Sequence, residues 1–171
     1  MIRTERLLIR EITAGDAESV RSVWEDFARS PYSCYDAPTP ADAAESERRV
    51  RRMAESNRGE RDRFWGVLLD RVIIGYVELH RSGDEAEIGY CFHSAYHRKG
   101  YASESCRALI GCYRDAGVKR FTAGCALCNT PSAELLRSLG FRLIGTEKVS
   151  FYKDENGEDV VFEGGLFELT F

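Results

Sequence analysis

The sequence predicts an α/β (α+β) fold, in which helices pack against one mixed, mostly antiparallel sheet. Segments with the two-residue alternation of strands are interspersed with segments whose apolar residues recur at helical spacing. Three expected strands in the middle of the chain are joined by turns of two or three residues, which favours an antiparallel meander. The chain has 171 residues, of which 43% are apolar, so it can bury a core of its own, and we expect residues 1–171 to form a single domain.

The first third of the chain predicts one strand and two helices. Apolar residues over 3–12 indicate the strand, and Thr13 with Asp16 three residues later predicts a capping box that opens a helix over 13–28. Thr39 followed by Pro40 is typical of a cap and the first turn of a second helix, which we expect to end near residue 57.

The middle of the chain predicts the meander and a third helix. Strands are expected over 63–69, 72–80 and 85–92. Apolar residues at helical spacing follow from residue 102 onward, and Gly117 is placed to end that helix in the left-handed conformation.

The last third predicts a strand, a helix and a closing hairpin. The strand is expected over 120–127, the helix over 130–139, and the hairpin from 141–152 and 160–171 around a turn at 156–157. The predicted order is β-α-α-β-β-β-α-β-α-β-β, which gives seven strands flanked by four helices.

Charge and composition argue against several classes of protein. The formal net charge is −4, whereas a nucleic-acid-binding domain would be basic. Four arginines between 48 and 52 are accompanied by Glu45, Glu47 and Glu55, which favours a solvated helix face over a nucleic-acid patch. The longest apolar run has six residues from Val72, far below the roughly 20 of a spanning helix. We therefore expect no nucleic-acid or membrane partner and, because the first ten residues contain no apolar signal segment, a cytoplasmic location.

The six cysteines predict neither a disulfide framework nor a metal site. Cys125 and Cys128 form one CxxC pair, with no second pair and no histidine at ligand spacing, so no bound metal is expected. Reduced and mostly buried cysteines are the favoured interpretation.

One junction predicts anion binding. The strand that ends at Phe92 gives way to a basic loop that contains Gly100, and a helix starts directly after it. The first N–H groups of a helix lack intrahelical partners, and the helix dipole adds partial positive charge there. Gly100 lets the backbone approach a ligand closely, and Ala102 leaves room beside it. Between residues 98 and 142 there are eight basic and three acidic residues, an excess that suits a small polyanion such as a pyrophosphate.

A second segment completes a family pattern. Residues 98–105 read Arg-Lys-Gly-Tyr-Ala-Ser-Glu-Ser, and residues 129–141 read Asn-Thr-Pro-Ser-Ala-Glu-Leu-Leu-Arg-Ser-Leu-Gly-Phe. Together these segments resemble the coenzyme A motifs of the GNAT N-acetyltransferase superfamily, with His97 where that motif usually begins with glutamine or arginine. The opening residues 3–10 are similar to those of its ribosomal-protein N-terminal acetyltransferase (RimJ/RimL-like) branch. The resemblance spans nearly the whole chain and implies a GNAT-like fold, with acetyl-CoA as cosubstrate and without a metal.

The resemblance also implies which residues hold coenzyme A. Backbone amides over 98–103 would hold the pyrophosphate, the side chains of Arg98 and Lys99 would reach the 3′-phosphate, and the main chain over 90–92 would pair with the pantetheine arm. Asn129 and Ser132 would lie beside that arm, although a plain helix cap also explains Asn129. The implied cofactor-binding set is Tyr90, Cys91, Phe92, Arg98, Lys99, Gly100, Tyr101, Ala102, Ser103, Asn129 and Ser132.

The implied reaction is direct transfer of an acetyl group to a primary amine, which must be neutral to attack. At pH 7 an α-amine of pKa about 8 is about 10% neutral, whereas a lysine amine of pKa about 10.4 is about 0.04% neutral. An acceptor with a lysine-like amine therefore needs a strong base, and an α-amine needs little help. None of the six cysteines lies where an acyl-enzyme would require one, which favours direct transfer.

Two carboxylates are candidate general bases. Glu87 begins the strand that leads into the loop and is slightly favoured over Glu78, near the end of the preceding strand; the meander places them on adjoining strands, where one can raise the pKa of the other. Both could equally be solvent-facing strand residues. Many relatives carry a tyrosine acid seven residues after the asparagine, but here that position is Leu136. The proton donor is then Ser132 or water, with Tyr152 as a weaker candidate.

The acceptor is open at this point. A protein N-terminal α-amine is favoured; the alternatives are a small-molecule amine, such as a polyamine or an antibiotic, and a non-catalytic acyl-CoA-binding module. From residue 153 onward six acidic residues stand against one basic residue, which would suit a basic acceptor or serve solubility alone. The first two helices, the loop 30–38 and the hairpin 151–160 are expected to recognise the acceptor, in a monomer or a homodimer.

Overall fold

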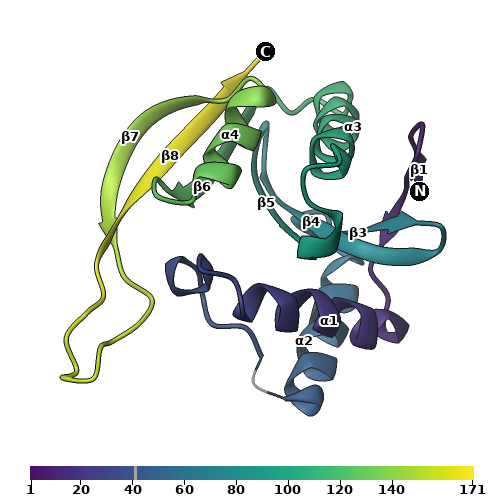
Figure 1. The fold of residues 1–171 in the computed structure, drawn as a ribbon. Coiled ribbons are helices and arrows are strands. Elements are labelled where there is room, and N and C mark those ends of the chain that lie inside the picture. Colours follow the sequence, from purple (N-terminus) through teal and green to yellow (C-terminus); the bar gives the residue numbers. More distant parts are fainter. Residues whose placement is uncertain (41) are drawn as a thin grey trace.

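The computed structural model describes residues 1–40 and 42–171, and it contains an eight-stranded sheet with helices on both of its faces (Figure 1). The strands and helices in chain order are β1 (Ile2–Arg3), β2 (Leu8–Glu11), α1 (Ala17–Ala28), α2 (Ala43–Ser56), β3 (Asp62–Leu69), β4 (Val72–Ser82), β5 (Glu85–Phe92), α3 (Tyr101–Asp115), β6 (Arg120–Ala126), α4 (Thr130–Ser138), β7 (Arg142–Val149) and β8 (Phe162–Thr170). The strand order is β1-β2-β3-β4-β5-β6-β8-β7, and among the described strands β5 and β6 alone run parallel. The predicted mixed, mostly antiparallel α+β fold is confirmed.

The sequence predicted one continuous strand over 3–12, but the structure has two short strands there. A turn closed by a hydrogen bond from the Thr4 N–H to the Leu7 carbonyl, 3.0 Å, divides 3–12 into β1 and β2, which pair antiparallel. Leu7, at the end of this turn, and Ile9, in β2, are buried, whereas Leu8 between them is only half-buried. The sheet therefore has eight strands instead of seven.

The second helix begins later than Thr39 and Pro40 predicted. Asp42 caps α2, because its carboxylate accepts a hydrogen bond from the Glu45 N–H at 2.7 Å. A carboxylate at the cap accepts a hydrogen bond from a first-turn amide that would otherwise lack a partner. Ala41, inside the predicted helix, lies outside the described residues. The capping box of Thr13 and Asp16 is confirmed, although it opens one 3₁₀ turn before α1.

The meander is confirmed, and its turns have the geometry that tight hairpins require. Asp70 and Arg71 both have positive φ, 49° and 73°, as in the two-residue turn whose twist matches the strands that it joins. The predicted ends of the two later helices are also confirmed, since Gly117 and Gly140 have φ of 95° and 96°.

Each face of the sheet has its own apolar core. Helices α3 and α4 cover one face, where Leu109, Leu136 and Phe167 are fully buried. Helices α1 and α2 cover the other face of the β2–β5 part, where Trp24 and Val50 pack against strand residues (Figure 1). Helices thus cover both faces of the sheet between β2 and β5, and each buried cluster stabilises the fold by about 25 cal/mol per Å² of apolar surface removed from water.

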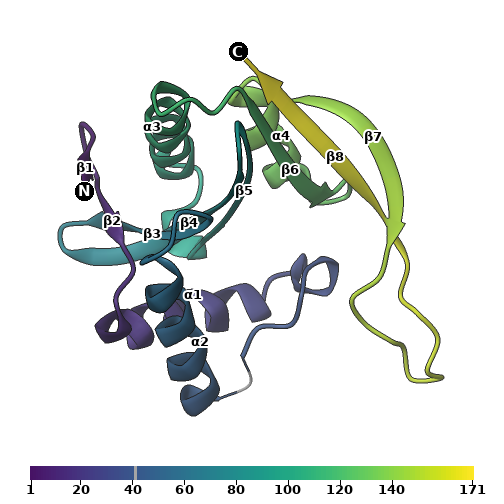
Figure 2. The ribbon, with the colours of Figure 1, turned by 180° about the vertical axis from the view of Figure 1, so that it is seen from behind.

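The closing hairpin is shorter in its strands and longer in its connection than the sequence predicted. Residues 150–161 extend beyond the sheet toward the side on which α1 and α2 lie (Figure 2). Gly157, with φ of 81°, makes the predicted turn. The Tyr152 hydroxyl donates to the Ser33 carbonyl at 3.3 Å, so this connection contacts the loop after α1.

A prediction for stability follows from the tight contact between β4 and β5. A Cβ on Gly75 would lie within 3.0 Å of the Phe92 ring and 2.7 Å from the Cys91 carbonyl oxygen, so Gly75→Ala forces both strands apart. We expect a loss of about 1 to 3 kcal/mol in the free energy of unfolding, measured by urea titration. Gly111→Ala, in open space within α3, is the control and should stabilise by about 0.5 to 1 kcal/mol. An unaffected Gly75→Ala would contradict the packing.

Candidate active site

The candidate site lies where the sheet opens. Strands β5 and β6 pair over three residues only, Glu85–Glu87 with 120–122, although both strands continue. Beyond Glu87 the strand β5 stays with β4 as far as Phe92, whereas β6 continues its pairing with β8. The central sheet thus splits, and the rest of β5 presents an unpaired edge.

The register decides which main-chain groups lie on that edge. The His93 N–H donates to the Ile74 carbonyl at 3.0 Å, and the antiparallel alternation then directs the odd-numbered residues of β5 toward β4. The main-chain groups of Ile88, Tyr90 and Phe92 point to the open side. Cys91 does not fit its predicted place on this edge, because its main chain faces Tyr76 of β4.

The loop after β5 forms the predicted junction with a helix N-terminus. Gly100 is the N-cap of α3 in the left-handed conformation, with φ of 82°, and Arg98 also has positive φ, 56°. Within residues 1–40 and 42–171, the N–H groups of 98–103 have no carbonyl or side-chain acceptor, and the first intrahelical donor is Glu104, to the Gly100 carbonyl at 2.9 Å. Six consecutive amides are therefore available to an anion at the positive end of a helix.

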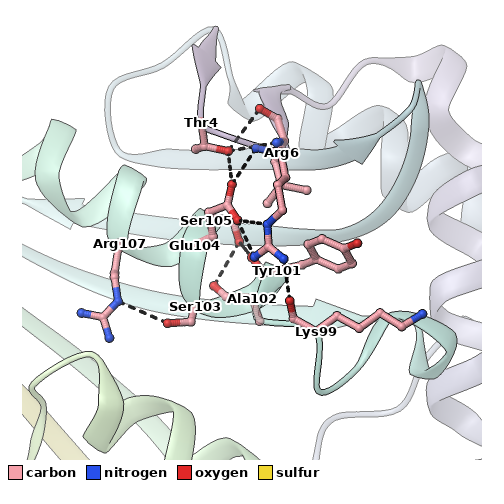
Figure 3. A network of polar contacts seen from close by, with 10 residues as sticks. Thr4, Arg6, Lys99, Tyr101, Ala102, Ser103, Glu104, Ser105 and Arg107 are labelled. Atoms are coloured by element: carbon pink, nitrogen blue, oxygen red, sulfur yellow. Dashed lines mark hydrogen bonds and ion pairs between the residues drawn. The ribbon is translucent and has the colours of Figure 1, made fainter.

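The N-terminal hairpin holds this cradle from outside, a role that sequence reasoning missed. The Arg6 guanidinium pairs with Glu104 at 2.6 Å, donates to the Lys99 carbonyl at 2.9 Å, and lies 4.7 Å from the centre of the Tyr101 ring (Figure 3). The Thr4 hydroxyl also donates to Glu104. Burial opposes the charge of Glu104, but hydrogen bonds from Thr4 and Arg6 outweigh it and lower the pKa of this carboxyl. The sequence separation of about 100 residues left no local signal for this contact.

The entry to the loop is held in the same way. The Asp26 carboxylate of α1 accepts hydrogen bonds from the Ser94 N–H and hydroxyl at 2.6 and 2.7 Å, and these outweigh burial and lower the pKa of Asp26. The His97 ring bonds to the Phe92 carbonyl at 2.7 Å, so one of the edge groups already has a partner.

Asn129 and Ser132 lie at the start of α4. The Asn129 side chain accepts a hydrogen bond from the Ser132 N–H at 3.3 Å, so it is the helix cap that the sequence also allowed, with its amide N–H₂ left to donate. The Ser132 hydroxyl is 2.9 Å from the hydroxyl of Tyr90, which joins α4 to β5 at the split. Burial raises the pKa of Tyr90 and keeps its phenol protonated.

The two candidate bases share one face of the sheet but differ in environment. Glu78 is half-buried and its carboxylate lies over Gly89, where a Cβ would be 2.6 Å from Oε1; Glu87 is exposed and stands opposite His80. Burial raises the pKa of Glu78, and the charges of Asp36 and Glu87 act in the same direction against His80 and Arg49. The predicted electrostatic effect of one carboxylate on the other is therefore present.

The remaining candidates are peripheral to this group. Tyr152 contacts the loop 30–38, and burial raises the pKa of its phenol. The expectation of mostly buried cysteines is wrong: Cys106 is buried, Cys91 and Cys125 are half-buried, and Cys34, Cys112 and Cys128 are exposed. In the part of the chain that is described, all six are free, and no cluster of three His, Cys, Asp or Glu side chains is placed to hold a metal ion. None of the described helices is long and apolar enough to cross a membrane.

The open edge of β5 leads to a helix start that can bind an anion. Comparisons with known proteins identify the class of protein with this arrangement as the acyl-CoA-dependent transferases. Residues 6–142 match the family described as acetyltransferase (GNAT) domain. The chain belongs to this GNAT family and is an acetyl-CoA-dependent N-acetyltransferase. It is 29% identical over 149 residues to the uncharacterized N-acetyltransferase YnaD of Bacillus subtilis, with 84% of each chain covered. It is 30% identical over 149 residues to the uncharacterized N-acetyltransferase p20 of Bacillus licheniformis, with 83% and 82% covered.

Solved structures agree on the fold. A GNAT acetyltransferase from Bacillus anthracis superposes with a TM-score of 0.77 at 26% identity and covers 99% of this chain and 97% of its own. The ribosomal L7/L12 α-N-protein acetyltransferase RimL superposes with a TM-score of 0.85 at 17% identity and covers 98% and 92%. The predicted similarity to the RimJ/RimL-like branch is thus confirmed at the level of structure.

A prediction on pH follows from the network around Glu104. Because its pKa in the folded protein is lowered below the unfolded value of about 4.3, its stabilising contribution is complete above pH about 5 and is lost as the pH falls through the folded-state pKa. We expect Glu104→Gln to destabilise the protein by about 1 kcal/mol at pH 7, since Arg6 is partly exposed. In urea titrations the difference from wild type should shrink below pH about 4.

The exposed Glu134→Gln in α4 serves as the matched control and should change stability at neither pH. A Glu104→Gln variant that loses as much stability at pH 3.5 as at pH 7 would show that shape, not charge, holds the network.

Proposed function

We propose that this enzyme transfers an acetyl group directly from acetyl-CoA to a primary α-amine, with a protein N-terminus as the favoured acceptor. The proposal rests on one juxtaposition: six available amides at the start of α3 lie at the end of the strand whose free edge passes Tyr90. The half-buried carboxylate of Glu78 lies on the neighbouring strand.

These residues fit coenzyme A in charge and in hydrogen bonding. The amides of 98–103 would hold the pyrophosphate, and the exposed side chains of Arg98 and Lys99 stand next to them for a further phosphate. The main-chain groups of Ile88 and Tyr90 would pair with the amide groups of the pantetheine arm as an added strand does. The free amide of Asn129 and the hydroxyl of Ser132 would donate on the opposite side, from α4.

Acetyl transfer needs a general base that takes a proton from the attacking amine and a general acid that gives one to the leaving thiolate. When bound, acetyl-CoA supplies a thioester carbonyl for the amine to attack. Glu78 would accept the proton of the incoming ammonium, and burial suits it to this role because it brings the pKa of the carboxyl nearer to that of the amine. Ser132, bonded to the protonated phenol of Tyr90, would donate to the thiolate, whose pKa of about 8.5 demands only modest help.

The preference for an α-amine rests on the cost of deprotonation. Freeing an α-amine of its proton at pH 7 costs about 1.4 kcal/mol, against about 4.6 kcal/mol for a lysine amine. A single carboxylate of raised pKa is a sufficient base to deprotonate an α-amine. The likeness to RimL, whose description names an α-N-protein acetyltransferase, shows the fold alone, so this preference needs a test of its own.

The first test concerns the cradle. Gly100→Val places a β-branched residue at positive φ, with its Cβ 3.2 Å from the Arg6 guanidinium, and closes the approach to the amides. We expect calorimetry to show at least about a tenfold loss of coenzyme A affinity, the equivalent of about 1.4 kcal/mol. Gly117→Val carries similar backbone strain at the far end of α3 and should keep wild-type affinity. Equal affinity in all three proteins would exclude the cradle as the phosphate site.

The second test separates the two carboxylates. Both Glu78→Gln and Glu87→Gln are nearly isosteric and should spare coenzyme A affinity. We expect Glu78→Gln to lower kcat/KM for a peptide α-amine by about 10²-fold at pH 7, with recovery as the pH rises and the amine loses its proton unaided. The effect of Glu87→Gln should be smaller, because its carboxylate is exposed. The reverse result would assign the base to Glu87, and full activity of both variants would remove the carboxylate base.

A further inference from the structure

A pocket of about 240 Å³ opens beside Glu78, between the helices α1 and α2 and the strands β3 and β4. Aromatic, apolar and charged side chains line it together: Trp24, Arg49, Arg52, Met53, Ser56, Phe64, Tyr76 and Glu78. Glu78 is the residue that this pocket shares with the proposed transfer site, because its carboxylate lies over Gly89 of β5. An acceptor whose amine reaches Glu78 would therefore place its remaining atoms in this pocket.

The pocket is held in a fixed shape. The Trp24 indole N–H donates to the Tyr76 hydroxyl at 3.0 Å, and the two rings meet edge to face at 6.3 Å. Both side chains are less than a tenth exposed, and so is Met53. The Arg49 guanidinium lies 5.0 Å from the centre of the Trp24 ring and donates to the Pro38 carbonyl at 3.4 Å. The contact with the ring face and the hydrogen bond restrict the guanidinium, which limits the entropy lost when it binds a ligand.

Arg49 and Arg52 form no close ion pair within the described part of the chain. Among the described residues no carboxylate lies within 4.0 Å of the guanidinium of Arg49 or Arg52. Asp36 and Glu78 act on Arg49 only through longer-range electrostatics. The sequence predicted that the arginines of α2 lie on a solvated helix face. Arg48 and Arg51 are exposed as predicted, but Arg49 is half-buried and lines the pocket.

The size of the pocket limits what it admits. Sites for drug-sized ligands usually span about 300 to 1,000 Å³, so a volume of 240 Å³ suits one amino-acid-sized group. Two guanidinium groups repel a second ammonium group, which disfavours a polyamine, and they bind a carboxylate in a planar, two-point geometry.

We propose that Arg49 and Arg52 select an acceptor that carries a carboxylate in the same small unit as its primary amine. Two sources have this chemistry: a peptide whose first residue has an acidic side chain, and a free amino acid. The inference rests on the proposed function, in which the amine is acetylated beside Glu78. It names the substrate class of that site, with Arg49 as the specificity-determining residue and Trp24 as the residue that positions it.

The experiment measures thiol release from acetyl-CoA with matched acceptors. One pair is a short amidated peptide that begins with Glu and the same peptide that begins with Gln. A second pair is alanine and alaninamide, compared at equal concentrations of neutral amine, and spermidine is the cationic acceptor. We expect kcat/KM to favour the carboxylate member of at least one pair by about tenfold or more, which corresponds to one charge-assisted hydrogen bond, and to be lowest for spermidine. The pair that shows the preference identifies the source.

Variants then assign the preference to the pocket. Arg49→Met keeps the stem over Trp24 and removes the charge, so the ratio between the members of the preferred pair should fall toward one. Arg48→Met, on the exposed side of the same helix, is the matched control and should keep the wild-type ratio. Coenzyme A affinity by calorimetry shows that each variant is folded.

The outcomes separate this inference from the proposed function. Thiol release at equal rates within both pairs, or fastest with spermidine, overturns the inference and leaves acetyl transfer standing. Preserved selectivity in Arg49→Met also overturns it. If no acceptor reacts, each member of the two pairs is titrated with coenzyme A present and followed by tryptophan fluorescence. Saturable binding of the carboxylate member alone, in either pair, supports the inference, and no binding up to 10 mM, about the weakest useful affinity, overturns it. Failure to bind coenzyme A at all would instead reject the proposed function.

Discussion

The early end of the pairing between β5 and β6 is the constraint on which the rest of the structure depends. After three residue pairs the two strands follow different partners, and the edge of β5 from Ile88 to Phe92 has hydrogen-bonding groups without a neighbouring strand. Such groups are costly to bury unpaired, so an open edge in the middle of a sheet is maintained where a ligand completes it. The hydrogen bond between Tyr90 and Ser132 spans this opening and keeps β5 and α4 at a fixed separation.

Contacts distant in sequence hold both ends of the anion-binding loop. Arg6 and Thr4 of the N-terminal hairpin bind Glu104 in the first turn of α3, and Asp26 of α1 binds Ser94 at the loop entry. Left-handed backbone at Arg98 and Gly100 is thereby kept in place, although the first of these is not a glycine. Because these contacts form without a ligand, we expect little ordering entropy to oppose binding.

The two faces of the sheet contribute different parts of the candidate site. The face of α3 and α4 supplies the cradle and the start of α4, while the face of α1 and α2 supplies the charged pocket and Glu78. A strand places alternate side chains on opposite faces, so β4 and β5 can serve both at once: Tyr90 reaches toward α4 and Glu78 toward α2. The cosubstrate and the acceptor are thereby expected to approach the open edge from different sides.

The sequence by itself determined what is local. Turn geometry at Asp70 and Arg71, helix ends at Gly117 and Gly140, the meander and the helix start at Gly100 all depend on neighbouring residues, and all are present as predicted. The GNAT family, predicted from two short motifs, is confirmed as well. The late start of α2, the turn that divides the first strand, and the exposure of three cysteines were missed, because competing caps and burial are settled by packing. Only the tertiary structure placed Arg6 against Glu104, withdrew the main chain of Cys91 from the open edge, and turned Arg49 toward Glu78. Each of these depends on register or on contacts between distant segments, for which a chain read residue by residue has no signal.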